Sequence, residues 1–144
     1  MIKTTAPGKV VLWGEYAVLA GAAAGVMALN TPATVAASRS TDDAWHFSSQ
    51  GFGAEPVSCP ANELPKNTAT ALLAAVLRHW GFGSLDQCGQ AMRVHTDSSA
   101  FFQDSQKLGL GSSAAVCAAT YRLLCELTAR IPTLTEAMAI HRDW

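Results

Sequence analysis

The chain has 144 residues, of which 49% are hydrophobic and 15% charged, so it can bury the core of one globular domain. Its formal net charge of −1 at pH 7 gives no support to nucleic-acid or anionic-membrane binding, and no apolar run is long enough to cross a bilayer. Four scattered cysteines without a CxxC pair, and a sequence start that lacks a signal-peptide pattern, favour reduced thiols and a cytoplasmic protein.

The first half of the chain is predicted to contain four strands. Short runs of β-branched, aromatic and alanine residues are bounded by Gly, Pro or Asn, as is usual for strands that end at turns. The expected strands are residues 9–13, 25–29, 33–38 and 44–49, the last of them at a sheet edge. Asn30, Thr31 and Pro32 predict a turn between the second and third strands, and residues 50–62, which lack periodicity, predict a loop.

Three helices and one more strand are predicted in the second half. Apolar residues recur at helical spacing over residues 65–80, and Gly81 is suited to end that helix. Residues 91–96 predict a short strand. A last helix is expected from Thr133, which is spaced with Glu136 as in a capping box.

Residues 112–129 give the strongest helical pattern. One face of this helix is apolar and is expected to pack on the core, through Val116, Ala119, Leu123 and Leu127. The opposite face carries charges at intervals of four residues, and we expect a solvated, ion-paired stripe of Arg122, Glu126 and Arg130.

The stretch KLGLGSSAAV at residues 107–116 places two glycines and two serines where this helix should begin. One capping hydroxyl suffices for an ordinary helix start. A helix start that binds an anion needs glycines for close backbone approach and leaves its first N–H groups facing the ligand. A phosphate-binding loop and a plain capped turn without a ligand are therefore both open. The spacing matches neither the GxxxxGK[ST] loop nor GxGxxG, because the lysine comes first and Ala114 replaces the third glycine.

A second stretch, APGKVVLWGEYAVLAG at residues 6–21, precedes this loop in the chain. Together the two stretches resemble the GHMP kinase family, in the family's own order. Within it, GEYAVL at 14–19, DSSAFFQDSQKLGLGSSAAV at 97–116 and AMAIHR at 137–142 are most similar to phosphomevalonate kinases. Mevalonate kinases, the next most similar, typically have a histidine where Tyr16 stands. The resemblance implies an α+β fold over residues 1–144: the GHMP kinase N-terminal, ATP-binding domain, similar to ribosomal protein S5 domain 2, with helices packed on a mixed sheet.

The resemblance also implies a site for ATP and Mg²⁺. The ATP-binding residues are expected to be Lys107, Gly109, Leu110, Gly111, Ser112, Ser113 and Ala114. Ser113 is expected to be a Mg²⁺ ligand as well, and a hydroxyl is the hard oxygen donor that this ion takes. Lys9 is expected to be catalytic, because a fixed cation near the transferred phosphoryl group offsets charge in the transition state.

The acceptor is expected to be a small molecule bound by Glu15, Tyr16 and Ser98. Each of these positions keeps an ordinary structural alternative: a turn carboxylate for Glu15, a core aromatic for Tyr16 and a strand-ending Asp-Ser turn for Ser98. Lys107 has the alternative of simply facing solvent. No chemistry is assigned to His46, His79 or His95.

The expected function is transfer of the ATP γ-phosphoryl group to phosphomevalonate, a step in isoprenoid precursor synthesis. Mevalonate kinase-type activity and a truncated, non-catalytic nucleotide-binding domain are the alternatives. The family continues past the last helix into a segment with a catalytic aspartate and into a C-terminal domain, which this chain lacks after Trp144. We therefore expect the 144-residue chain by itself to be inactive and to self-associate through exposed apolar surface.

Overall fold

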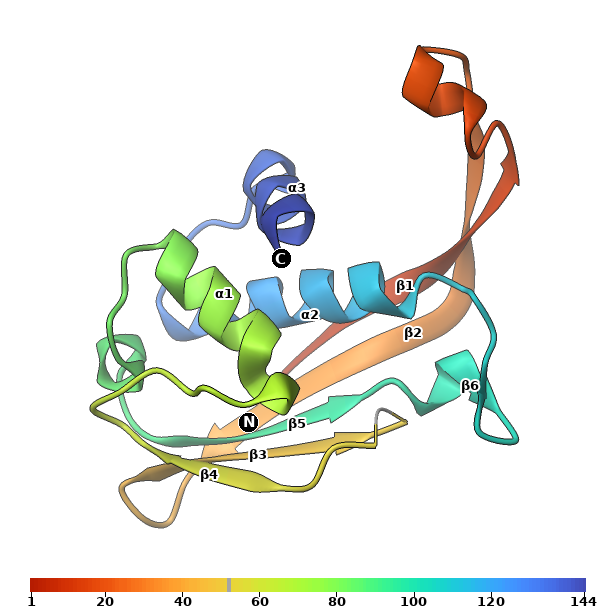
Figure 1. Cartoon of the computed structure of the whole chain (residues 1–144). Helices are drawn as coiled ribbons and strands as arrows, with labels where there is room; N and C mark the ends of the chain where they lie inside the picture. Colours follow the sequence, from red (N-terminus) through yellow and green to blue (C-terminus); the bar gives the residue numbers. More distant parts are fainter. Residues whose placement is uncertain (52) are drawn as a thin grey trace.

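The computed structural model describes residues 1–51 and 53–144; residue 52, in the segment predicted as a loop, lies outside the described residues. A five-stranded sheet carries its helices on one face (Figure 1). The strands are β1 Ile2–Trp13, β2 Gly25–Arg39, β3 Ala44–Gln50, β4 Val57–Pro60 and β5 Met92–Asp97. Their order is β1-β2-β5-β3-β4, with β3 and β5 parallel and the other neighbours antiparallel. The expected α+β fold with a mixed sheet is confirmed.

The main helices are α1 Ala71–His79, α2 Ser112–Leu127 and α3 Leu134–Asp143. Single 3₁₀ turns are η1 Ala17–Ala20, η2 Thr68–Thr70, η3 Leu85–Cys88 and η4 Ser99–Phe101, and β6 Phe102–Gln103 pairs with β7 Gln106–Lys107 in a small hairpin. Among the described residues, no helix has the length and apolar character needed to span a membrane. All four cysteines are free and buried.

The turn predicted at residues 30–32 is wrong, because β2 runs through it without a break. β1 and β2 pair along almost their whole lengths, with Pro7 opposite Pro32. The register shifts between Pro7 and Gly8, and such an irregularity is one of the few places where a sheet tolerates proline. Long-range pairing with β1 therefore overrides the local turn signal.

The predictions for residues 44–62 are also partly wrong. β3 is an inner strand rather than an edge strand, since it lies between β5 and β4. The edge is β4, a strand within the segment predicted to be a loop. It has only four residues, includes Pro60 and buries Cys59 alone, so its sequence carries little strand pattern.

The helix predicted over residues 65–80 is shorter than expected. Pro65 lies outside it, and Asn67 caps the 3₁₀ turn that leads into α1 by accepting a hydrogen bond from the Thr70 N–H at 3.0 Å. Gly81 ends the helix as predicted, with φ of 76° and its N–H donating to the Arg78 carbonyl. The strand predicted at residues 91–96 is β5, displaced by one residue.

The charged stripe of α2 is exposed as predicted but is not ion-paired. No salt bridge joins Arg122, Glu126 and Arg130 within the described part of the chain. The Arg130 guanidinium instead lies over the Trp80 ring, 4.6 Å from its centroid. α2 ends at Leu127 and Ala129 has φ of 53°, so Arg130 lies beyond the helix and loses its helical spacing with Glu126. A cation over an aromatic face also competes well with a solvated ion pair.

Glu136 attaches α3 to the other two helices. Thr133 caps α3 as predicted, its hydroxyl accepting from the Glu136 N–H at 3.2 Å, but the Glu136 carboxylate does not complete a capping box. It accepts from Trp80 Nε1 at 3.1 Å and from the Tyr121 hydroxyl at 2.6 Å. Burial and the contact with Glu136 raise the pKa of Tyr121 to about 12.

The far ends of β1 and β2 project from the body as a hairpin with η1 at its tip (Figure 1). Apolar side chains here are exposed: Leu12, Trp13, Tyr16, Val18, Leu19, Val26 and Met27. Trp13 covers Gly25 so closely that a Cβ at Gly25 would collide with the indole ring. We call residues 12–27 the projecting hairpin.

Candidate functional site

The two stretches singled out in the sequence touch each other in the fold. The Lys9 N–H of β1 donates to the Leu110 carbonyl at 2.8 Å. A Cβ at Gly111 would lie 2.7 Å from Lys9 Cγ, and one at Gly8 would lie 2.9 Å from the Leu110 oxygen. Glycine at both positions therefore permits an approach that any side chain would obstruct.

This contact places the loop at an uncapped helix start. Gly111 is the N-cap of α2, with φ of 74°, and no side chain accepts from the first turn. The first backbone bond there is from the Ala115 N–H to the Gly111 carbonyl, at 3.1 Å. Within the described residues, nothing accepts from the N–H groups of Ser112, Ser113 and Ala114. A plain capped turn would have a capping side chain, whereas unsatisfied N–H groups suit an anion.

A cavity of about 270 Å³ opens beside this helix start. Of the predicted site residues, it is lined by Ser98, Lys107, Ser112 and Ser113. Side chains that the sequence did not indicate also line it, among them Phe47, Glu55, Thr68 and Trp144. They come from β3, the loop before β4, η2 and the last residue of the chain, and no motif connects these segments.

Lys107 is carried to the cavity by the β6–β7 hairpin. Phe102 and Lys107 are paired across it, and the turn residues Asp104 and Ser105 have φ of 48° and 67°. Tight hairpin turns require this left-handed conformation, which aspartate tolerates better than most residues do. Lys107 is exposed and also lines the cavity, so it is both solvated and available to an anion there.

Ser98 is held in the turn that was the structural alternative for this segment. Asp97 accepts from the Ser99 N–H at 2.9 Å and from the Ser99 hydroxyl at 2.7 Å, and these bonds lower the pKa of Asp97. The Ser98 N–H donates to the Gln50 carbonyl at 2.9 Å, and the residue is only 2% exposed. Ser98 nevertheless contributes to the cavity wall.

Glu15 and Tyr16 lie apart from the cavity, at the tip of the projecting hairpin. Tyr16 is 81% exposed, which rules out the core-aromatic alternative. The other predicted residues, Lys9, Gly109, Leu110, Gly111 and Ala114, do not line the cavity; Lys9, Leu110 and Gly111 make the contact between β1 and the loop. The structure therefore joins the predicted ATP-binding residues and Lys9, and separates two of the three predicted acceptor-binding residues from them.

No protein-family model matches the chain, and no curated protein matches it. Solved structures do match. Streptococcus pneumoniae phosphomevalonate kinase in complex with phosphomevalonate and AMPPNP is 20% identical with a TM-score of 0.74, over 98% of this chain and 41% of that chain. Methanococcus jannaschii mevalonate kinase is 17% identical with a TM-score of 0.76, over 99% and 45%. Lactococcus lactis galactokinase complexed with galactose is 16% identical with a TM-score of 0.74, over 98% and 36%.

This chain has the fold of the GHMP kinase N-terminal domain. The likeness extends over nearly all of it, and it spans less than half the length of each of these kinases. At such identities the shared property is the fold, while substrate and activity have to be argued from the site.

The donor set at this site suits Mg²⁺ only together with a phosphate. Over residues 1–51 and 53–144, no group of three or more His, Cys, Asp or Glu side chains is arranged to hold a metal ion. Ser113 is exposed at the helix start and offers one hydroxyl oxygen. Mg²⁺ commonly combines a few protein oxygens with substrate phosphate oxygens and water, and one serine fits that mode of binding.

Proposed function

We propose that residues 1–144 are the ATP-binding domain of a GHMP-type small-molecule kinase. The observation that supports this most is the contact between Lys9 and the loop at residues 109–111, at the uncapped start of α2. It brings the backbone and side-chain stem of a lysine next to a row of unsatisfied N–H groups, and phosphoryl transfer uses a cation and N–H donors in combination. The likeness in fold to kinases of different small molecules supports the same class of reaction.

The nucleotide phosphates are assigned to the N–H groups of Ser112, Ser113 and Ala114. The helix dipole of α2 adds to their attraction for an anion, and the adjoining cavity takes the rest of the nucleotide. Lys107 supplies a second cation at the cavity wall. Mg²⁺, held by Ser113 and phosphate oxygens, would neutralise phosphate charge when bound.

Lys9 is assigned to the transferred phosphoryl group. Its stem packs against Gly111, so little side-chain freedom is left to lose when the ammonium group meets an anion. The acceptor is proposed to be phosphomevalonate, with mevalonate as the alternative, on the sequence around Tyr16. Ser98 is proposed to bind it from the cavity wall. A role for Glu15 and Tyr16, which lie apart from the cavity, stays a prediction from the sequence resemblance. The proposed location is the cytoplasm.

A non-catalytic nucleotide-binding domain is the second candidate, since the uncapped start of α2 and the cavity beside it account for nucleotide binding by themselves. Both candidates require nucleotide binding, and only the first requires phosphoryl transfer by a protein that contains this domain. For the 144-residue chain alone, we expect binding without turnover, because positioning of both reactants dominates this chemistry.

The test measures binding of a fluorescent ATP analogue to the chain in the presence of Mg²⁺, with displacement by ATP. Gly111→Ala should abolish saturable binding, because a Cβ 2.7 Å from Lys9 Cγ, at a φ of 74°, would displace the helix start that carries the N–H groups. Gly81→Ala is the matched control, since Gly81 has a similar φ of 76° and open space around it, and it follows α1, outside the predicted site. Equal loss in both variants, or no displacement by ATP, would count against the proposal. Turnover is then assayed with phosphomevalonate and mevalonate.

A further inference from the structure

The sheet face turned away from the helices carries a second group of functional side chains. Along β3, Trp45 and Phe47 are buried toward the core, so His46 and Ser48 point to the opposite face. A shallow hollow of about 440 Å³ lies there and is lined by His46, Ser48, Ser58, Arg93 and His95, among others. The helix start and the loop at residues 109–113 do not contribute to it, so an inference from this hollow is independent of the kinase proposal.

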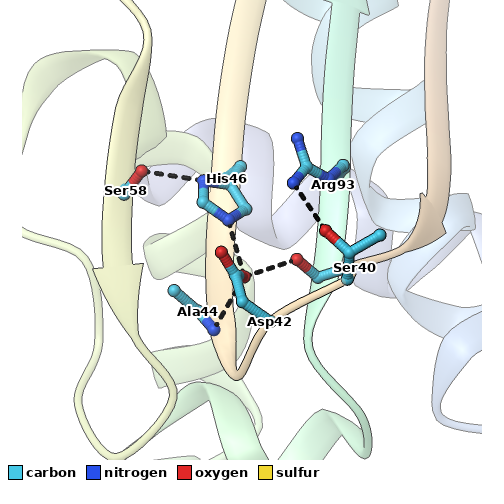
Figure 2. Close-up of polar contacts among 7 residues, drawn as sticks. Ser40, Asp42, Ala44, His46, Ser58 and Arg93 are labelled. Atoms are coloured by element: carbon cyan, nitrogen blue, oxygen red, sulfur yellow. Dashed lines mark hydrogen bonds and ion pairs between the residues drawn. The ribbon is translucent and has the colours of Figure 1, made fainter.

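Two of these side chains, His46 and Ser58, form a continuous hydrogen-bonded chain with the neighbouring Asp42 (Figure 2). Asp42 Oδ1 lies 2.8 Å from His46 Nε2, and His46 Nδ1 lies 2.8 Å from Ser58 Oγ. Asp42 also accepts from the Ser40 hydroxyl at 2.8 Å and from the Ala44 N–H at 3.2 Å. The carboxylate is therefore fixed by the turn between β2 and β3 before it meets the imidazole.

These partners determine where the protons lie. The hydrogen bonds from His46 and Ser40 lower the pKa of Asp42 to about 2, so its carboxylate is ionised and can only accept. His46 Nε2 must then carry a proton in neutral imidazole, and Nδ1 has the lone pair. The Ser58 hydroxyl consequently donates to Nδ1. This order of donor, base and orienting carboxylate is the one that activates a serine.

We infer that Ser58 is a nucleophilic serine, with His46 as its general base and Asp42 as the positioning residue, and that it reacts with small activated acyl esters. Ser58 Oγ forms a bond to the ester carbonyl carbon while its proton passes to His46 Nδ1. The bond from that carbon to the leaving oxygen then breaks, and the same proton goes to the leaving alkoxide. Water, deprotonated by Nδ1, attacks the acyl-serine, releases the carboxylic acid and returns the proton to Ser58.

Arg93 supplies a positive group to the same hollow. It stands opposite His46 in the parallel register of β3 and β5, and its guanidinium donates to the Thr41 hydroxyl at 3.1 Å. A guanidinium has five N–H donors, so others are available to an oxyanion that develops on the substrate. His46 is 27% and Asp42 54% exposed, and Ser58 is exposed, so an ester in solution can reach the nucleophile.

The same hollow contains a matched control. Ser48 Oγ lies 2.8 Å from His95 Nδ1, the same distance as in the pair of Ser58 and His46. No carboxylate among the described residues hydrogen-bonds the other nitrogen of His95. Ser48 therefore shares exposure, the imidazole contact and the location with Ser58, and lacks the orienting carboxylate.

The experiment treats the chain with a fluorophosphonate probe, which loses fluoride when a serine oxygen bonds to its phosphorus, and maps the adduct by mass spectrometry. We expect the adduct on Ser58 and not on Ser48. His46→Gln should slow labelling about a hundredfold, the scale of a general base, whereas His95→Gln should leave the rate unchanged. Asp42→Asn should lower the maximal labelling rate without changing the probe concentration that gives half of it.

Absence of a Ser58 adduct, or equal adducts on Ser48 and Ser58, would overturn the inference without any variant being needed. An unchanged labelling rate in a folded His46→Gln variant would overturn it as well, and thermal unfolding measured by circular dichroism shows whether the variant is folded. Ser58→Ala, at an exposed position of edge strand β4, should lose the adduct and the hydrolysis of p-nitrophenyl acetate together.

Discussion

The two ends of the β1–β2 pair differ in what covers them. At the base, Thr4 and Ala6 are buried, and the Thr4 hydroxyl donates to the Ala119 carbonyl of α2 at 2.7 Å. In the projecting hairpin, Trp13 is 62% exposed and Leu19 84%. The same two strands therefore pack against the core at one end and form the exposed, apolar projecting hairpin at the other. The base is fixed by packing within the chain, and the apolar surface of the projecting hairpin is left exposed.

The largest expected effect comes from filling the close contact at the base. A Cβ at Gly8 would meet Phe101 Cε1 at 2.8 Å and the Thr31 oxygen at 3.1 Å, and the second cannot move without shifting β2. Gly8→Val should lower the free energy of unfolding by about 3 kcal/mol. Urea unfolding measures it. Gly21→Ala in the projecting hairpin, where φ is 84° and the space is open, is the control and should lower the free energy of unfolding by about 1 kcal/mol.

The next effect concerns the contact that holds α3 against the other two helices. Tyr121→Phe leaves the Thr133 N–H and the Glu136 carboxylate without the hydroxyl that joins them, and should cost about 2 kcal/mol. It should also remove a pH dependence. The pKa of Tyr121 is raised to about 12 in the folded state, so its contribution is complete below the unfolded value near 10 and is lost as pH rises to 12. Denaturant unfolding at pH 8 and pH 11 compares the variant with the parent, and parallel losses in both would contradict this.

A smaller effect is expected at the helix start, next to the base. Ser113→Ala should weaken binding of the ATP analogue about tenfold in Mg²⁺, or about 1.4 kcal/mol, because one metal oxygen is lost. Binding in EDTA should be unchanged, since the backbone N–H groups remain. Ser112→Ala is the control variant. A loss of the same size with and without Mg²⁺ would remove Ser113 from the metal site.

The smallest effect on stability is expected in the projecting hairpin itself. Leu19→Glu removes an exposed apolar side chain and should change the free energy of unfolding by less than about 0.5 kcal/mol. It should nevertheless reduce self-association, measured by sedimentation velocity over a range of concentrations. Leu134→Glu, at a position 77% exposed on α3, is the control outside the projecting hairpin. A parent chain that stays monomeric at high concentration would show that the projecting hairpin does not mediate self-association.

Local patterns in the sequence predicted most of the helices that cover one face of the sheet. The periodicity of α2 and the stop at Gly81 are short-range features, and the structure has them where they were expected. The errors occur where distant residues decide the outcome. Pro32 has a turn-forming neighbourhood, yet β1 pairs across it; Arg130 has Glu126 four residues away, yet Trp80 attracts it.

The residues of the candidate site fall into the same two groups: those that stretches of the sequence predict, and those that only the folded chain brings together. The glycine-rich loop and the lysine of β1 could be predicted as partners, because both belong to recognisable stretches that resemble one family. Phe47, Thr68 and Trp144 could not, since only the folded chain brings β3, η2 and the C-terminal residue around one cavity. The chain of hydrogen bonds through His46 was missed for a related reason: Asp42 is near in sequence, but Ser58 reaches the imidazole only through the pairing of β3 with β4.

The strand order has a consequence for how the chain assembles during synthesis. β5 lies between β2 and β3, although it follows both in the sequence by more than fifty and forty residues respectively. Before β5 is available, the pairs β1–β2 and β3–β4 form two separate ribbons, each with an open inner edge. Closing the sheet requires long-range contacts, which form slowly, and open strand edges are where chains pair with the wrong partner. We therefore expect the yield of folded chain to depend most on the insertion of β5 between β2 and β3.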